Sequence, residues 1–484
     1  MEGGRHAAYL VGVASEPMPA PSHSFKLADV CANLAQHAPQ PLTYEGLCNW
    51  VEGIDWTGCD WADHVPEVES ANDYARNILC LEPFEVVLLH WPAGVESAVH
   101  HHEGFWGTVV CLQGVLENVT YSLDDGVLRK KDVLQALPKG MVPEPDGTIH
   151  KIRNGSASEA LVTLHFYHPA LKDLNGLVLY DLATGSAMTC NETAPTASIH
   201  LPASNYRRIE QQAFHYVPPP EASHVQCNVV PKPDADAIER MIEGYFAEHA
   251  NQYDALDAQI LKRRQYTSAI DRLVAEGLRT LAHAQPVERV MHLACGTGRR
   301  AVEIRTESGL GYTMEGVDMC NEMATQAAAR GLDVQVASLR HPAEFMAENA
   351  FDAVTLLYAY GHLPNRMTRQ NIIQASFDML KPGGAFYFDA FDAEDEHEWG
   401  PEALQQFQEQ RLGPQGYEEG DVFYRRARGE HVAFLHYCSS ARLRELMQTA
   451  GFVDIEMTTI GYDQSVGVES HNGKLFVSGR KPLD

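Results

Sequence analysis

The chain has 484 residues and a formal net charge of −28 at pH 7, with 45% hydrophobic and 21% charged residues. This acidic balance argues against a nucleic-acid-binding surface and against binding to anionic membranes, because both need a basic face. No stretch approaches the roughly 18 apolar residues of a membrane-spanning helix. The ten cysteines form no Cys-x-x-Cys pair, and the N-terminal segment lacks the pattern of a signal peptide. We therefore expect a cytoplasmic protein of two or three domains.

The first part of the chain divides into a loose arm and a strand-rich domain. Residues 1–24 contain Gly, Pro and Ser with little periodicity, and we expect a flexible arm there. After a stretch of helical patterning, short apolar runs alternate with Gly, Pro and Asp turns from Phe84 to about Tyr167. Regularly spaced short strands of this kind are typical of a sandwich or barrel. The first domain is therefore predicted at residues 25–215.

The second part follows a stretch rich in prolines. Prolines are spread over residues 185–232, and since proline stops helices and central strands we place a Pro-rich linker at 216–232. A helical pattern begins at Ala235, and strands then alternate with helices. The predicted strands are at residues 289–294, 314–318, 351–358 and 385–389. Such alternation predicts a doubly wound, mostly parallel sheet within residues 233–484.

The strand-rich domain contains a histidine pattern suited to binding a metal. The pattern consists of Gly94, His100, His102, Gly107 and Gly114. Side chains alternate across a strand, so two histidines at i and i+2 point to the same face and can share one ion. A third ligand is available from the later segment Pro145–Asn154, in which a Pro-x-Gly turn precedes His150. Together the two segments resemble the two cupin motifs.

Residues 25–215 resemble the cysteine dioxygenase family of thiol dioxygenases. The segment Val99–Gly107 is similar to the family's first metal-binding segment. The resemblance implies Fe(II) bound by His100, His102 and His150, with open positions for a thiolate and dioxygen. Mammalian members carry a cysteine crosslinked to a tyrosine at the position of Gly107. Bacterial members have glycine there, so no crosslinked cofactor is expected.

The same resemblance implies the substrate-binding residues of this domain. Tyr74 and Arg76 match the family's substrate-binding segment, and Arg76 would hold a substrate carboxylate through two parallel hydrogen bonds. Thr163, His165 and Tyr167 match the family's Ser-x-His-x-Tyr relay, with threonine in place of serine. Tyr167 would position the oxygen or the substrate.

A second, unrelated pattern lies in the C-terminal part. Ala294–Gly298 reads Ala-Cys-Gly-Thr-Gly, follows a predicted strand and opens a helix, and the acid Asp318 lies 20 residues after Gly298. Glycines let the backbone approach a cofactor, and the helix N-terminus faces its polar end. Residues 233–484 resemble class I S-adenosylmethionine-dependent methyltransferases. The resemblance implies S-adenosylmethionine as cofactor, and the short Gly-x-Gly spacing disfavours NAD.

Cofactor and acceptor residues follow from this second resemblance. The expected cofactor-binding residues are Ala294, Gly296, Gly298, Asp318, Ser338, Leu339 and Tyr253. The expected acceptor-pocket residues are Tyr358, Tyr360, His362 and Asp389, with His362 able to remove a proton. Residues 391–440, including Trp399 and Tyr424, are expected to cap the acceptor. The sequence departs from the family at His292 and Ser338, which stand where an acid is usual, and at Ala294, which replaces a glycine.

The expected fold is an all-β cupin barrel with N-terminal helices, followed by an α/β Rossmann-like methyltransferase domain. Our leading hypothesis is a bifunctional enzyme of small sulfur metabolites, in which Fe(II)-dependent oxygenation turns a thiol into a sulfinate and the second domain methylates a small molecule. One alternative is an N-methyltransferase acting on a thiol-bearing amino acid such as 5-thiohistidine, of the ovothiol kind, whose cupin binds substrate or dimerises. Another is a metabolite sensor without turnover. A homodimer is left open.

Overall fold

The computed structural model describes residues 26–27, 29–30, 32, 42–219, 224–255, 261–426, 431–467 and 472–483, with backbone only for residues 261–265 and Arg426. The arm expected at residues 1–24 lies outside the described residues. Within the described part of the chain, no helix combines the length and the apolar character needed to cross a membrane.

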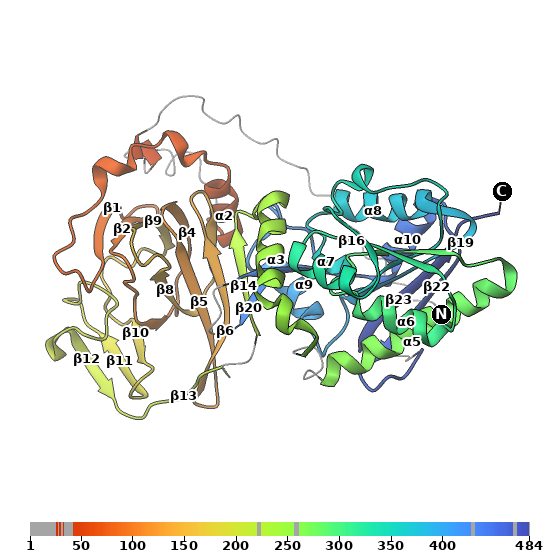
Figure 1. Ribbon diagram of the computed structural model, residues 1–484. Coiled ribbons are helices and arrows are strands. Elements are labelled where there is room, and N and C mark those ends of the chain that lie inside the picture. The colour runs from red at the N-terminus through yellow and green to blue at the C-terminus, as the bar shows by residue number, and fades with distance from the viewer. Residues whose placement is uncertain are drawn as a thin grey trace, which may run out of the picture.

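The N-terminal domain is built from two facing β-sheets (Figure 1). The first sheet is antiparallel and has the order β1-β2-β9-β4-β7. Its strands are β1 (Ala75–Cys80), β2 (Glu85–Trp91), β4 (Trp106–Gln113), β7 (Met141–Glu144) and β9 (Leu161–His168). The second sheet runs β12-β11-β10-β3-β8-β5-β6. Its strands are β3 (Val99–His101), β5 (Leu116–Asp124), β6 (Val127–Ala136), β8 (Ile149–Asn154), β10 (Val178–Asp181), β11 (Ser186–Cys190) and β12 (Tyr206–Glu210).

Strand β9 shows how the sequence separates the two faces of the first sheet. Val162, Leu164 and Phe166 alternate with the relay residues and pack in the layer that contains helix α2 (Tyr44–Glu52). Burial of each such side chain contributes about 1.5–3 kcal/mol. Helix α2 starts at Thr43, whose hydroxyl accepts a hydrogen bond from Gly46 N. The opposite face of β9 therefore points between the two sheets.

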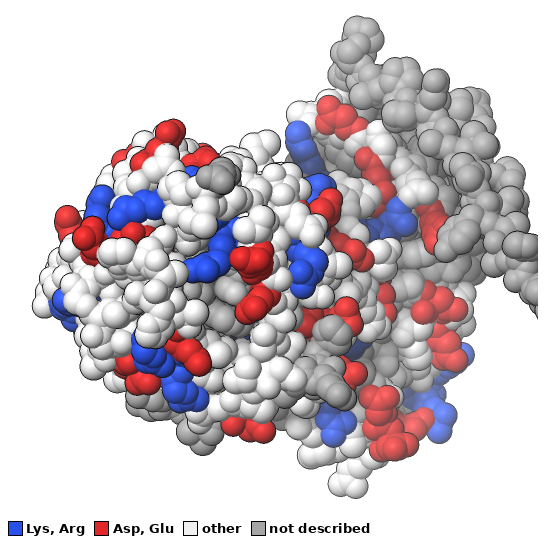
Figure 2. Space-filling view, turned by 90° about the vertical axis from the view of Figure 1, so that its right-hand side faces the viewer, with Lys and Arg blue, Asp and Glu red and all other residues white. Residues whose placement is uncertain are grey.

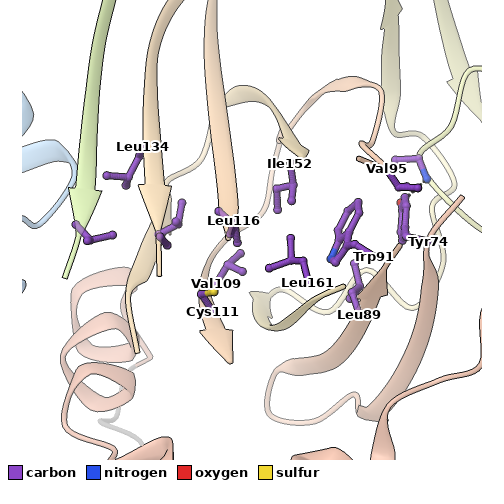
Figure 3. Packing of buried hydrophobic residues seen from close by; sticks show 14 of the residues in the cluster. Tyr74, Leu89, Trp91, Val95, Val109, Cys111, Leu116, Leu134, Ile152 and Leu161 are labelled. Atoms are coloured by element: carbon purple, nitrogen blue, oxygen red, sulfur yellow. Dashed lines mark hydrogen bonds between the residues drawn. The ribbon is translucent and has the colours of Figure 1, made fainter. Parts of the chain in front are cut away.

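The space between the sheets is largely apolar. Figure 3 shows Val109, Leu116, Ile152 and Leu161 directed toward one another from both sheets. Trp91 lies at the edge of this cluster and stacks on Tyr74, with ring centroids 4.1 Å apart. This packing holds the inner side chains of β3, β8 and β9 in fixed positions.

The C-terminal domain contains a seven-stranded sheet of order β17-β16-β15-β18-β19-β23-β22, in which β23 runs antiparallel to its neighbours. The strands are β15 (Arg289–Leu293), β16 (Thr313–Asp318), β17 (Asp333–Val336), β18 (Phe351–Leu356), β19 (Leu380–Asp392), β22 (Val453–Gly461) and β23 (Gly473–Arg480). Helices α5 (Leu261–Ala284) and α6 (Arg299–Ser308) share one buried cluster on the sheet, and α8 (Arg366–Met379) and α10 (Ser440–Ala450) share another. The four predicted strands are all present.

The linker expected at residues 216–232 is largely strand, which corrects the prediction. Strand β13 (His215–Val217) and the last four residues of β14 (His224–Val230) pair in parallel with β6. The first three residues of β14 pair antiparallel with β20 (Asp421–Arg426), which continues through β21 (Ala433–Cys438) to β19. The prolines follow the strands rather than interrupting them, so no ladder hydrogen bond is lost. The prolines after residue 185 likewise lie outside the strands that form there, β11 and β12.

Polar side chains reinforce this junction between the domains. Asn228 on β14 donates to the amide oxygens of Gln406 (3.2 Å) and Gln410 (3.0 Å), on and just after helix α9 (Gly400–Glu409), and accepts from Phe423 N. The amide nitrogens of both glutamines donate to Asp132 on β6. The network thereby links β6 of the N-terminal domain to α9 and β20 of the C-terminal domain.

Figure 2 shows acidic and basic side chains interspersed over one face of the molecule, with neutral surface between them. The described residues form no continuous basic surface on this face.

Replacing Asn228 with alanine is expected to destabilise the junction by about 2–3 kcal/mol, because it leaves buried polar partners on the C-terminal domain unsatisfied. Urea unfolding followed by fluorescence measures the effect. Asn175→Ala, at an exposed loop position, serves as the control and should leave the free energy of unfolding unchanged. Equal behaviour of the two variants would contradict the role of the network.

Candidate active sites

Three buried histidines converge between the sheets of the N-terminal domain. His100 on β3 lies directly opposite His150 on β8 in the strand pairing, and His102 follows β3. The Nε2 atoms are 3.1 Å apart in His100 and His150, 3.0 Å in His102 and His150, and 3.3 Å in His100 and His102. Of the described residues, these three form the cluster that can hold a metal ion. The arrangement presents one nitrogen from each ring to a common point.

The protonation of the three rings fits metal binding. Burial lowers the pKa of His100 to about 4 and the pKa values of His102 and His150 well below the usual 6.5, so the rings are neutral. His100 Nδ1 donates to Ala98 O (2.9 Å) and His150 Nδ1 to the Asn118 side-chain oxygen (2.6 Å). These bonds fix the proton on Nδ1 and turn the Nε2 lone pairs toward the common point.

A chain of hydrogen bonds runs along the inner face of β9. The Trp91 indole donates to the Thr163 hydroxyl (2.9 Å), which donates to His165 Nε2 (2.8 Å). His165 Nδ1 then donates to the Tyr167 oxygen (2.8 Å). The direction follows from the indole, which can only donate, and from the Thr163 proton, for which His165 Nε2 is the acceptor in reach. The hydroxyl proton of Tyr167 therefore takes no part in this chain of hydrogen bonds.

A cavity of about 470 Å³, including its open mouth, is lined by Tyr74, Arg76, Trp91, His100, His102, His165 and Tyr167. Thr163 and His150 lie behind these residues and do not line it. Arg76 Nη2 donates to Glu85 Oε1 (3.1 Å), and Glu85 Oε2 accepts from the backbone N of Leu171 (2.8 Å). Glu85 is fully buried, so one edge of the guanidinium is fixed while the residue faces the cavity. The Tyr74 hydroxyl accepts from Ala197 N (2.6 Å). Arg76 was predicted from the sequence, but Glu85, which lies on β2, the strand paired with β1, was not.

A second cavity, of about 1110 Å³ including its open mouth, lies at the carboxyl ends of the parallel strands. The predicted residues that line it are Tyr253, Ala294, Gly296, Asp318, Leu339, Tyr358 and His362. Asp318 ends β16, and its two carboxylate oxygens accept from Gly296 N (2.8 Å) and Cys320 N (2.9 Å). The carboxylate is therefore fixed beside the glycine loop, with one lone pair of each oxygen left over.

Family models match the two halves of the chain separately. Residues 57–177 match the model described as cysteine dioxygenase type I, and residues 262–457 match the model described as methyltransferase domain. The chain carries a domain of each of these two enzyme families. Comparison with curated protein sequences gave no match.

Solved methyltransferase structures align with roughly the second half of the chain. One from Thermotoga maritima, described as a possible histamine N-methyltransferase, is 18% identical, covers 49% of this chain and 97% of that chain, and has a TM-score of 0.34. One from Methanosarcina mazei is 20% identical, covers 41% and 95%, and has a TM-score of 0.33. One from Clostridium acetobutylicum is 14% identical, covers 48% and 98%, and has a TM-score of 0.35.

Four residues predicted for the methyltransferase cavity do not line it: Gly298, Ser338, Tyr360 and Asp389. Gly298 begins α6 with φ of 77°, and a Cβ there would lie 2.9 Å from Ala327 Cα, so the position serves close packing. Tyr360 is fully buried and packs on Phe388 with centroids 5.3 Å apart, because its turn directs the ring into the core. The Ser338 hydroxyl donates to Glu239, which itself lines the cavity.

Other expectations about the methyltransferase domain are also revised. Asp389 lies below the cavity, where it accepts from Tyr358 N (2.6 Å). Trp399 and Tyr424 pack on each other with centroids 5.4 Å apart, and neither is among the described residues that line the cavity. His292 is buried in the sheet and bonds to the Thr355 hydroxyl (2.8 Å).

Sequence reasoning missed two charged residues of the methyltransferase cavity. Glu239 lies on helix α3 (Ala235–His249), and the signal was only that an acid stood on the helix expected to cover the cofactor. Arg300 follows the glycine loop and is fixed by Asp271, with Nε 2.8 Å from one carboxylate oxygen. Arg300 Nη1 has no hydrogen-bond partner among the described residues, and the side chain lines the cavity.

Glu144 is a second residue, after Glu85, that the sequence analysis missed in the cysteine dioxygenase domain. It ends β7, lies directly opposite Gly107 of β4 and is fully buried. Its Oε2 is 3.8 Å from His102 Nδ1, and its Oε1 is 3.6 Å from His150 Nδ1. Burial raises the pKa of Glu144 to about 8. The only sequence signal was its place directly before the Pro-x-Gly turn.

Gly107 has no room for a side chain. A Cβ at this position would lie 2.0 Å from Phe166 O and 2.5 Å from a ring carbon of Tyr167. Gly107→Ala is expected to cost about 3 kcal/mol of stability and to displace Tyr167, because neighbouring backbone cannot give way cheaply. Thermal unfolding and iron content measure the two effects. Gly244→Ala, in a helix with open space, should be neutral or slightly stabilising; a stable, iron-replete Gly107→Ala protein would contradict the packing argument.

Proposed function

We propose that this protein is a bifunctional enzyme of small sulfur metabolites. Its first domain oxygenates a cysteine-like thiol to a sulfinate on Fe(II), and its second domain transfers a methyl group from S-adenosylmethionine to a small molecule. The observation that carries the first half is the convergence of three neutral His Nε2 atoms, with two of the histidines lining a cavity beside an arginine and a tyrosine. Fe(II) bound by His100, His102 and His150 would activate dioxygen next to the substrate thiolate.

The residues around the histidines bind and orient the thiol. Arg76, braced by Glu85, takes the substrate carboxylate through its remaining donors. Burial and the neighbouring Glu144 raise the pKa of Tyr167 well above 10.0, so the phenol stays protonated and donates. The chain from Trp91 to His165 supplies the Tyr167 oxygen with a donor, so the phenol proton can be donated to another acceptor. The apolar walls exclude water.

In the second domain, the chain binds the cofactor and aligns the acceptor. The glycine loop approaches the amino-acid end of the cofactor, and Asp318 accepts from the ribose hydroxyls. His362 Nδ1 donates to Phe434 O (2.8 Å), so Nε2 is the ring nitrogen that would take a proton from the acceptor. Methyl transfer needs little more than this alignment, because proximity and orientation supply most of the rate.

Replacing His100 with alanine is expected to abolish iron binding and oxygen uptake while leaving S-adenosylhomocysteine binding intact. Metal analysis, an oxygen electrode and isothermal titration calorimetry follow the three properties. Oxygen uptake that survives in this variant would show that the metal assignment is wrong.

Asp318→Ala is expected to have the opposite effect, impairing the second domain and leaving the first intact. Loss of the hydrogen bonds to the ribose should weaken S-adenosylhomocysteine binding about 10–100-fold, a loss of about 1.4–3 kcal/mol, with iron content unchanged. Unchanged affinity for S-adenosylhomocysteine would remove Asp318 from the cofactor site.

One aerobic incubation tests the whole proposal. It contains iron-loaded protein, S-adenosylmethionine and a panel of thiols that includes cysteine and thiolated histidines, and products are identified by mass spectrometry. A product heavier by two oxygens supports the dioxygenase, and a methyl group on the same molecule links the domains. Methyl addition without oxygenation would overturn the first half and leave the cupin as a binding module of an N-methyltransferase.

A further inference from the structure

The metal-binding histidines have a buried carboxyl neighbour, Glu144, whose effect on the histidines plays no part in the proposed function. Glu144 is 0% exposed and interacts with the neighbouring Tyr167 hydroxyl, but neither of its oxygens makes a hydrogen bond of standard geometry among the described residues. His102 Nδ1 is the one ring nitrogen of the three histidines that likewise lacks a partner there. The shortest distance between the two groups, from Glu144 Oε2 to His102 Nδ1, is 3.8 Å.

The position of Glu144 excludes it as a fourth ligand of the same ion. Its oxygens face the Nδ1 atoms of His102 and His150, whereas the Nε2 atoms converge on the opposite side of the rings. A carboxylate at this place acts through the histidines. It can accept the Nδ1 proton of His102, as Ala98 O does for His100 and Asn118 does for His150.

Charge balance gives Glu144 a second effect. Three neutral imidazoles bring no negative charge to a divalent cation, and a buried cation without a counter-charge is costly. A buried carboxylate without a counter-charge is costly for the same reason. The two costs offset each other when the cation is bound, because the charges then attract across a single ring in a medium of low dielectric constant.

We propose that Glu144 is a positioning residue of the metal centre: it orients His102 through Nδ1 and supplies the negative charge that the three histidines lack. The inference rests on the proposed function, since it presumes a divalent ion at His100, His102 and His150. It predicts that the carboxylate favours the metal-bound protein and disfavours the metal-free one.

Glu144→Gln separates these effects from a structural role, because glutamine keeps the shape and an acceptor oxygen but removes the charge. The dissociation constants of Fe(II) and of Co(II) should each rise about 10–100-fold. The metal-free variant should unfold at the same temperature as the metal-free parent or at a higher one, since a buried carboxylate without a counter-charge has been removed. Anaerobic titration followed by Co(II) absorbance, with Fe(II) in competition, and thermal unfolding give both readouts.

The matched control is Asp132→Asn, which removes another buried carboxylate of the same domain. Asp132 lies on β6, where Gln406 and Gln410 donate to it, and it has no contact with the three histidines in the described structure. Its substitution should leave both metal affinities unchanged.

Two results would overturn the inference. One is an unchanged metal affinity of the Glu144→Gln protein, which leaves the proposed function standing because the parent still binds metal. The other is an affinity loss accompanied by an equal loss of metal-free stability, which makes Glu144 a structural residue. A parent protein that binds neither Fe(II) nor Co(II) would instead reject the metal centre of the proposed function itself.

Discussion

The pairing of β3 with β8 places His100 opposite His150, and the whole N-terminal site depends on that register. A slip of one residue would turn His100 and His102 to the other face of the strand, because side chains alternate. The register is fixed by packing: β3 is held between β8 and β10, and the apolar cluster between the sheets supports β8 from inside. The position of each imidazole is therefore a result of core packing as much as of the histidine sequence itself.

The cavities of the two domains share one structural feature. Each cavity contains an arginine fixed by a buried carboxylate, Arg76 by Glu85 and Arg300 by Asp271. A braced guanidinium loses less conformational freedom when it binds an anion, since part of its planar fork is already ordered. Under the proposed function, both sites would thus be preorganised for ligands that carry a carboxylate, although their folds are unrelated.

The sequence predicted those parts of the sites that lie close together in the chain. The spacing of His100, His102 and His150, and the glycine loop before Asp318, are local patterns whose geometry follows from strand and turn rules. Partners such as Glu85, Glu144 and Asp271 come from other strands or helices, and only the three-dimensional pairing brings them to the site. The prediction that Tyr360 lines the acceptor pocket was wrong for a related reason. A short turn decides whether the ring faces the cavity or the core.

The linker prediction failed because proline density was taken to mean irregular structure, whereas the prolines follow strands that both domains use. Strand β14 pairs with β6 of one domain and with β20 of the other. The two halves are therefore not independent units joined by a flexible linker. A protein cut at this strand would leave an open sheet edge on one half or the other, and such edges recruit further strands and promote aggregation. Dissection of the two activities is consequently better done with point substitutions in the full-length chain than with separately expressed fragments.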